Sequence, residues 1–248
     1  MTRRRWIADE VSGSRAALTG AHAEHLSRVL RARVGQEFDI VATGEVRRGR
    51  VSSIGENRVE FELGDAVSAP ALLPITLALS IFKFDRMEWA IEKCTELGAA
   101  RIIPVIARRT EPRLAAASTK RVERWQRIAR EAAEQSRRSS TPEISQPIKL
   151  KEAVAIPGST RIVLAEVEEQ IALKDAVHAN SSGDVVLAFG PEGGWTNAEL
   201  QSFRDAGWTW ASLGGNILRA ETAAIAALAV VLAELHQLNP ASPANDLG

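Results

Sequence analysis

Five short apolar segments, separated by amphipathic stretches, constrain the fold of this chain more than any other feature. They are ITLALSIF (75–82), RIIPVIA (101–107), RIVLAEV (161–167), DVVLAFG (184–190) and the shorter WTWASLG (208–214). Such runs are typical of strands that are buried on both faces. Helical patterns cover 85–97, 118–138, 173–179, 197–206 and finally 220–236. This alternation predicts an α/β domain with a mostly parallel, doubly wound sheet.

The first 70 residues follow another pattern. AHAEHLSRVLRARVGQ (21–36) predicts one helix with Leu26, Val29 and Leu30 on its apolar side, ending near Gly35. EFDIVATG, EVRRGRVSSIG and NRVEFELGD then alternate in the manner of strands separated by glycine turns. We therefore predict a small β-rich domain at 1–70, a linker around AVSAPALLP, an α/β domain at 75–240 and a disordered tail at 241–248.

Composition excludes several classes of protein. The N-terminus MTRRRWIADE has charges where a signal peptide needs its apolar stretch, and the longest apolar run, 223–233, is too short to span a bilayer. The single cysteine, Cys94, permits no internal disulfide and no cysteine cluster, and the four histidines lack zinc-ligand spacing. We expect a cytoplasmic protein without a structural metal.

The charges are unevenly distributed although the formal net charge is zero. Residues 101–151 hold 13 Lys or Arg against 5 Asp or Glu, whereas residues 152–248 hold 4 against 12. A basic segment of this kind indicates a polyanionic partner, and it is equally compatible with a solvated helix face. In the 118–138 helix, the residues that recur at helical spacing and predict a core-facing side are Val122, Trp125, Ile128, Ala129 and Ala132.

The first candidate binding loop lies in DVVLAFGPEGGWTNAEL. A buried strand leads into Gly190-Pro191-Glu192-Gly193-Gly194, and Thr196 with Glu199 has the spacing of a capping box at a helix start. A strand, glycine turn and helix place backbone N–H groups at the carboxyl edge of the sheet, where ligands bind in α/β proteins. By itself the segment is also compatible with an ordinary tight turn.

WASLGGNILRAETAAIAALAVVLAELH repeats this arrangement around Gly214 and Gly215. Its helix is apolar almost all round, which indicates packing against a second subunit. Arg219, Glu221 and Thr222 lie at the first turn, where they are either site residues or only a helix cap and its ion pair. The chain contains neither GxxxxGK[ST] nor GxGxxG after an early strand, so a P-loop and a dinucleotide site are not supported.

Together, FGPEGGWTNAEL and LGGNILRAETAAIAAL strongly resemble the paired C-terminal motifs of the ribosomal RNA small subunit methyltransferase E family, within the SPOUT superfamily. FKFDRMEWAIEKCTELGA, EAAEQSRRSSTPEI and HLSRVLRARVGQ resemble further family motifs in the expected order. The resemblance covers roughly residues 3–238. Two positions depart from the pattern, because Arg137 stands where glycine is expected and Asn216 where arginine is expected.

This resemblance implies a PUA-like N-terminal barrel, a SPOUT domain with a trefoil knot, and a homodimer. It also implies S-adenosylmethionine as cofactor and a uridine N3 of 16S ribosomal RNA as substrate. Carried over to this sequence, the cofactor residues are Leu164, Ala165, Glu166, Gly190, Glu192, Gly193, Leu213, Gly214, Ile217, Leu218 and Thr222.

Arg219 is the candidate that stabilises negative charge on the uracil carbonyls, and Glu221 either orients Arg219 or assists proton removal. RNA binding is expected from two groups of arginines, in which phosphate contacts position the substrate. They are Arg3, Arg4, Arg5, Arg28, Arg31 and Arg33, and in the basic segment Arg124 and Arg127. The alternatives are a SPOUT enzyme acting on transfer RNA or a ribose hydroxyl, an inactive RNA-binding module, and a protein that binds nucleotide phosphates.

Overall fold

The computed structural model describes residues 5–67, 74–136, 138–166, 168, 170–178 and 183–238, with side chains described as far as Leu235. The chain forms two compact units, Met1–Ala71 with Arg130–Thr141, and Leu72–Ala129 with Pro142–Gly248. The sequence patterns do not anticipate that 130–141 group with the first unit. The expected tail at 241–248 lies outside the described residues.

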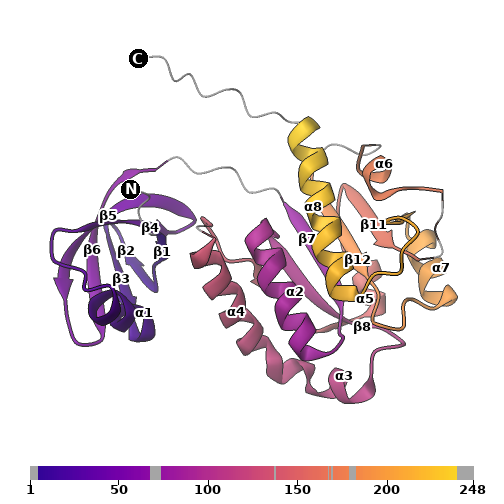
Figure 1. Ribbon diagram of the computed structural model, residues 1–248, viewed down its shortest axis with the longest axis horizontal. Helices are drawn as coiled ribbons and strands as arrows, with labels where there is room; N and C mark the ends of the chain where they lie inside the picture. Colours follow the sequence, from indigo (N-terminus) through magenta and orange to yellow (C-terminus); the bar gives the residue numbers. More distant parts are fainter. Residues whose placement is uncertain are drawn as a thin grey trace. The chain divides into compact units, whose positions relative to one another are not determined.

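The first unit contains a curled six-stranded sheet (Figure 1). Its strands lie in the order β1-β4-β5-β6-β3-β2, with β1 parallel to β4 and the other neighbours antiparallel. Leu18, Ile40, Val59 and Phe61 are fully buried inside the curl. The strands are β1 Arg5–Ile7, β2 Glu10–Ser12, β3 Arg15–Thr19, β4 Glu37–Ala42, β5 Glu45–Ile54 and β6 Arg58–Ala66.

The helix predicted for 21–36 is wrong in its length and in its buried side. The helix α1 covers Gly20–Glu24 and continues as a single π-helical turn, His25–Val29. Arg31 then adopts a left-handed conformation with φ of 51°, which ends the helix well before Gly35. Because the wider turn changes the periodicity, only Leu26 of the three predicted apolar residues is buried, and Val29 is 66% exposed.

A charged network explains why residues 130–141 belong to the first unit. The Arg130 guanidinium lies 2.8 Å from Asp9 Oδ1 and donates to the carbonyl of Ile7 at 3.0 Å. His22 lies between two carboxylates, with Nδ1 3.3 Å from Asp9 Oδ2 and Nε2 3.6 Å from Glu134 Oε2. Burial raises the pKa of the Glu134 carboxyl, an effect that His22 and Arg130 oppose.

The second unit has a seven-stranded sheet in which every described pairing is parallel. The order is β10-β8-β7-β12-β11-β13, and β9 pairs with β8. This confirms the predicted α/β class and all five predicted strands. The strands are β7 Ile75–Ser80, β8 Arg101–Ile106, β9 Glu143–Ile144, β10 Ile148–Lys149, β11 Thr160–Leu164, β12 Val185–Phe189 and β13 Thr209–Ala211.

Helices cover both faces of this sheet, because successive residues of each buried strand point to opposite sides. In β12, Leu187 and Phe189 pack in one core with α2, α4, α6 and α8, whereas Val186 and Ala188 pack in the other with α5 and α7. The helices are α2 Phe84–Leu97, α3 Pro112–Ser118, α4 Val122–Gln135, α5 Leu150–Val154, α6 Leu173–His178, α7 Asn197–Asp205 and α8 Ala220–Leu238.

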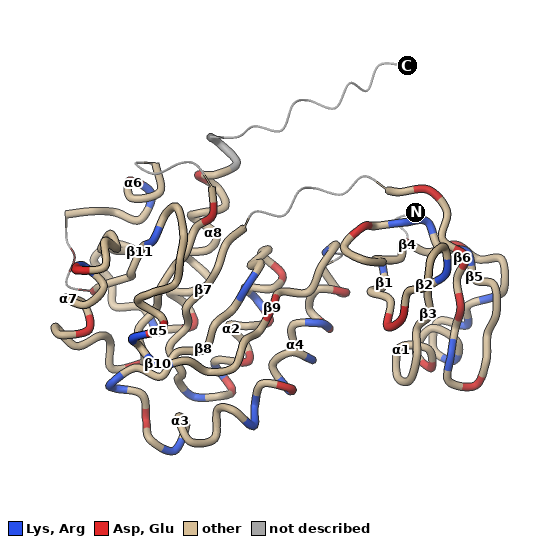
Figure 2. Tube along the Cα trace, turned by 180° about the vertical axis from the view of Figure 1, so that it is seen from behind, with Lys and Arg blue, Asp and Glu red and all other residues tan. Residues whose placement is uncertain are grey.

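The predicted helix at 118–138 consists of more than one element. α3 begins at Pro112, a short 3₁₀ turn covers Thr119–Arg121, and α4 follows. Proline at the first helical position explains the earlier start, which the spacing of apolar residues did not indicate. Val122, Trp125, Ala129 and Ala132 are buried as predicted, whereas Ile128 is only half-buried. Figure 2 shows Lys and Arg positions along α3 and α4.

The terminal helix α8 packs beside α2 in the second unit (Figure 1). Ala224, Leu228 and Val231 are fully buried on its inner side, whereas Ala229 and Ala233 are exposed. An apolar helix with small exposed alanines on its outer side is compatible with the predicted contact to a second subunit. Its first turn follows the loop after β13 and therefore lies near the carboxyl edge of the sheet.

Candidate functional site

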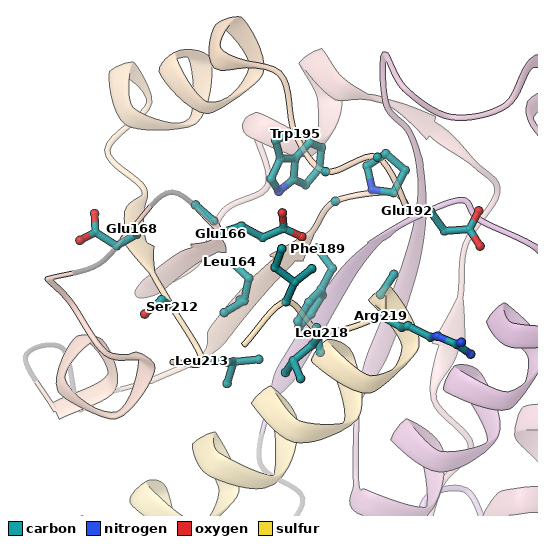
Figure 3. A pocket seen from close by; sticks show the side chains of 18 of the residues that line it. Leu164, Glu166, Glu168, Phe189, Glu192, Trp195, Ser212, Leu213, Leu218 and Arg219 are labelled. Atoms are coloured by element: carbon teal, nitrogen blue, oxygen red, sulfur yellow. The ribbon is translucent and has the colours of Figure 1, made fainter. Parts of the chain in front are cut away.

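Three loops meet at one edge of the parallel sheet, because β12, β11 and β13 are neighbours and run in the same direction. The loops follow the carboxyl ends of these strands, the edge at which ligands bind in α/β folds. They enclose a cavity of about 810 Å³, which we call the loop cavity. Figure 3 shows side chains that line it.

The predicted cofactor residues lie together around this cavity, with one exception. Thr222 is exposed on the first turn of α8 and is not part of the lining. The predicted residues that line the cavity are Leu164, Ala165, Glu166, Gly190, Glu192, Gly193, Leu213, Gly214, Ile217 and Leu218. Sequence reasoning missed further lining residues, among them Arg86, Arg109, Glu168, Phe189 and Trp195.

The loop after β12 turns tightly and needs glycine at two positions. A Cβ atom on Gly190 would lie 3.2 Å from the backbone of Gly194 and of Trp195. Gly194 has φ of +66°, a left-handed conformation, and its N–H donates to the Pro191 carbonyl at 2.7 Å. The loop is therefore a compact backbone turn rather than a flexible connection.

Hydrogen bonds hold this loop at its C-terminal end, where α7 begins, and on the side of the segment that follows β8. The predicted capping box is confirmed, with Glu199 Oε2 accepting from Thr196 N at 2.8 Å and Thr196 Oγ1 accepting from Glu199 N at 3.3 Å. The other oxygen of the buried Glu199 carboxylate accepts from the N–H of Arg108 at 2.7 Å. Arg109 donates to the carbonyl of Gly193 at 2.6 Å, so the end of β8 holds both the turn and its helix.

The loop after β13 supplies apolar surface and free backbone donors. Leu213 and Leu218 extend toward Leu164 and Phe189 in Figure 3, and these side chains form an apolar wall. Gly214 has φ of +107°. Within the described part of the chain, the N–H groups of 214–218 have no hydrogen-bond acceptor. Ile217 is 85% exposed, an unusual position for a large apolar side chain.

Charged groups lie on opposite sides of the cavity. Figure 3 places Arg219 and Glu192 on one side and Glu166 and Glu168 on the other. The exposed guanidinium of Arg219 has no ion-pair partner among the described residues. It is therefore available to a ligand in the cavity.

Glu221 is buried, with a side chain that is only 5% exposed, and its ion-pair partner is Arg86 at 3.8 Å. The sequence predicts that Glu221 orients Arg219 or assists proton removal. Among the described residues, no hydrogen bond or ion pair joins the side chains of Glu221 and Arg219, and Glu221 is not part of the cavity lining. Any orienting effect of Glu221 on Arg219 therefore acts through the backbone, because Glu221 lies on the first turn of α8 and Arg219 immediately precedes that helix.

The loop cavity has the properties of a small-molecule site. Its volume lies within the usual range, and an apolar wall is combined with a few polar groups and unpaired N–H donors. The apolar wall suits a flat aromatic base, and the N–H groups suit its acceptors. The carboxylates of Glu166 and Glu168 suit hydroxyl or cationic groups of the same ligand.

The predicted RNA-binding arginines differ in accessibility. Arg3 and Arg4 lie outside the described residues, as does the unusual Arg137. The side chain of Arg5 is 13% exposed and lies 4.0 Å from Asp39.

The other predicted RNA-binding arginines are exposed on both units. Arg31 and Arg33 have no ion-pair partner in the described part of the chain, whereas Arg28 pairs with Glu24 at 2.7 Å. Arg124 binds both oxygens of Glu88 at 2.7 and 2.8 Å. Arg127 is exposed on the same helix. Arg31 and Arg33 are thus the best placed to bind phosphates.

Other candidate chemistry finds little support. Burial raises the pKa of the Cys94 thiol to about 12, so this cysteine is a packing residue rather than a nucleophile. Among the described residues, no group of three or more His, Cys, Asp or Glu side chains is arranged to hold a metal ion. No described helix is both long and apolar enough to cross a membrane.

Comparisons with protein families match both units. The profile of an RNA methyltransferase domain matches residues 69–232, and that of an RNA methyltransferase PUA domain matches residues 18–64. Proteins named ribosomal RNA small subunit methyltransferase E are similar over most of the chain. The Synechocystis protein is 34% identical, with 92% of this chain and 76% of the relative covered. The Bacillus subtilis protein is 30% identical, and the match covers 87% of this chain and 88% of that relative.

Solved structures give the same result. A ribosomal RNA small subunit methyltransferase E from Neisseria gonorrhoeae, bound to S-adenosyl methionine, has a TM-score of 0.82 at 32% identity. The match covers 96% of this chain and 98% of the Neisseria gonorrhoeae chain. A putative methyltransferase from Legionella pneumophila, also with this cofactor bound, has a TM-score of 0.80 at 27% identity and covers 94% and 98%. The chain therefore belongs to the ribosomal RNA small subunit methyltransferase E family.

Proposed function

We propose that this protein transfers a methyl group from S-adenosylmethionine to N3 of a uridine in 16S ribosomal RNA. The family provides the reaction class, and its members are named for the small-subunit RNA. The observation that carries the proposal is the convergence of three loops, from three adjacent parallel strands, on one cavity with Arg219 in its wall.

The residues of the loop cavity fit the cofactor. The apolar wall of Leu164, Phe189, Leu213 and Leu218 suits the adenine ring, and the free N–H groups of 214–218 suit its nitrogen acceptors. Glu166, at the carboxyl end of β11, suits the ribose hydroxyls or the positive charge of the cofactor. Two similar proteins hold this cofactor in their solved structures.

The chemistry sets a clear task for the protein. When bound, the cofactor supplies an electrophilic methyl group on a sulfonium. Uracil N3 carries a proton and is a poor nucleophile until that proton leaves. As the N3–H bond breaks, negative charge develops on the neighbouring carbonyl oxygens. The N–CH₃ bond would then form as the S–CH₃ bond breaks, and the products would be 3-methyluridine, S-adenosylhomocysteine and a proton. The enzyme must hold the two reactants in line and stabilise that charge.

Arg219 is suited to the second part of this task. It lines the loop cavity, its guanidinium is exposed, and no described carboxylate neutralises it. A planar cation with several N–H donors can bind a uracil carbonyl through a charge-assisted hydrogen bond. Glu221 is a weaker candidate for proton removal, because it is buried beside Arg86 and lies outside the cavity lining.

The first unit and the outer side of α8 complete the proposal. The PUA domain, with its exposed Arg31 and Arg33, binds the RNA by phosphate contacts and shape. The apolar outer side of α8 joins two chains in a homodimer. The resemblance to the SPOUT superfamily supports a trefoil knot around the three loops, and a ribosomal substrate supports a cytoplasmic location.

The proposed reaction is tested by mapping the product. Purified protein is incubated with a labelled methyl donor and small ribosomal subunits that lack the modification. The expected result is one labelled uridine per 16S RNA, which mass spectrometry identifies as 3-methyluridine. A labelled ribose or a labelled transfer RNA would support the alternative SPOUT activities. Cofactor binding without transfer to any RNA would indicate an inactive binding module.

Removal of Arg219 separates catalysis from cofactor binding. We expect Arg219→Ala to lower kcat about 100-fold, the scale of one lost donor to a developing oxyanion, and to change the Kd for S-adenosylmethionine less than about threefold. Arg204→Ala is the matched control, because Arg204 lies outside the cavity and stacks on Trp210 at 3.6 Å. Equal losses of kcat and cofactor affinity in Arg219→Ala would contradict the catalytic role.

RNA binding through the first unit predicts a steep dependence on salt. Because each phosphate contact releases about one counterion, Arg31→Ala/Arg33→Ala should reduce the slope of log K against log salt by about 1.5 to 2. Arg58→Ala/Arg47→Ala removes the same charge elsewhere on the sheet, where Arg58 already pairs with Glu10 and Glu60. Equal slopes in wild type and in the Arg31 and Arg33 variant would argue against this surface.

A further inference from the structure

Arg86 joins the two glycine loops, although it lies on neither of them. It belongs to the first turn of α2, and its side chain lines the loop cavity while remaining 30% exposed. Its partners are Glu192, in the middle of the loop after β12, and Glu221, at the start of α8. The Arg86 guanidinium thus connects α2 with two segments that lie more than 100 residues later in the sequence, the loop after β12 and the start of α8.

The two contacts differ in character. Arg86 Nη1 donates to Glu192 Oε1 at 3.2 Å, a charge-assisted hydrogen bond to a carboxylate that is 37% exposed. Arg86 Nε lies 3.8 Å from Glu221 Oε1, and the Glu221 side chain is 5% exposed. The second Glu221 oxygen, Oε2, is buried without a hydrogen-bond partner among the described residues. A buried carboxylate depends strongly on a neighbouring cation, and Arg86 is the ion-pair partner of Glu221 among the described residues.

Arg86 links the turn after β12 to the helix start that follows Arg219. Glu192 is part of the turn whose backbone forms one wall of the cavity, and Glu221 is two residues from Arg219. A planar guanidinium can hold two carboxylates at fixed positions, which the single ammonium group of lysine does less well. The distance between the cofactor turn and the Arg219 backbone therefore depends on Arg86.

We propose that Arg86 is a positioning residue that clamps the Gly190–Gly194 turn to the first turn of α8, and so aligns the bound methyl donor with Arg219. This inference deepens the proposed function and rests on it. Arg86 acts through Glu192 and Glu221, so its effect must appear in the alignment of the reactants and must depend on these partners. The coupling between Arg86 and Glu192 is the measurable consequence.

A double-mutant cycle tests this coupling. Arg86→Met, Glu192→Gln and the double variant are compared in kcat and in the Kd for S-adenosylhomocysteine, which calorimetry measures without RNA. We expect Arg86→Met to lower kcat about 10-fold or more and to weaken binding several-fold. The kcat and the affinity of the double variant should be no lower than those of Arg86→Met alone, because Glu192→Gln removes a contact that Arg86→Met has already removed. Additive losses would overturn the clamp.

Stability requires its own control, because Arg86→Met leaves Glu221 buried and unpaired. Arg86→Met/Glu221→Gln removes that buried charge and should recover most of the lost Tm, whereas kcat should stay as low as in Arg86→Met. Recovery of kcat together with Tm would overturn the positioning role in favour of a purely structural one. Arg86→Lys should have a higher kcat than Arg86→Met, since lysine keeps the positive charge but lacks the planar set of N–H donors of the guanidinium.

Lys93→Met is the matched variant on the same helix. The Lys93 side chain is 33% exposed and contacts two carboxylates, Glu92 at 2.7 Å and Glu96 at 2.8 Å, outside the loop cavity. Lys93→Met should leave kcat and the Kd for S-adenosylhomocysteine unchanged, and an effect equal to that of Arg86→Met would overturn the inference. Wild-type protein that binds S-adenosylhomocysteine but methylates no RNA would contradict the proposed function, while the calorimetric cycle still decides the clamp.

Discussion

The parallel pairing of β12, β11 and β13 is the constraint on which the site depends. Because these three strands are neighbours with the same direction, the loops that follow them leave the sheet at one edge. Both faces of the sheet are covered by helices, so each strand is fixed by two cores. The loops are therefore carried by strands that are buried on both faces, and their relative positions follow from strand register.

Cationic side chains from other elements then fix the loops in place. Arg109, at the end of β8, binds the carbonyls of Gly193 and Trp195, and Arg86, on α2, binds Glu192. The turn after β12 is held from two directions, and the start of α8 shares one of the two clamps through Glu221. Arg219 remains exposed in this arrangement, and it has no ion-pair partner among the described residues.

Much of the second unit could be predicted because its signals are local. The buried strands, the capping box of Thr196 and Glu199, and the glycine loops are all encoded within short segments, and the structure brings nearly all predicted cofactor residues to one cavity. The clamps could not be predicted in this way. Arg109 lies 84 residues from Gly193, and Arg86 lies 106 residues from Glu192, so only the folded chain brings them together.

The errors have physical causes as well. The helix at 21–36 ends at Val29 because a π-helical turn and the left-handed Arg31 stop it, and neither feature has a simple signal in the spacing of apolar residues. The short strands β1 to β3 were not predicted, since strands of only 3 to 5 residues carry too little alternation to be recognised. Residues 130–141 join the first unit through Arg130 and Asp9, a long-range ion pair.

Calorimetry with S-adenosylhomocysteine on wild-type protein and Gly190→Ala tests the central claim most directly. Wild-type protein should bind one molecule per chain. In Gly190→Ala the added Cβ would lie 3.2 Å from the Gly194 and Trp195 backbone, so binding should weaken about 10-fold or more. Gly64→Ala, whose Cβ would meet only an ordinary contact at 3.4 Å in the first unit, should bind as wild type. No heat from folded wild-type protein, or equal affinity in Gly190→Ala, would contradict a cofactor site formed by these loops.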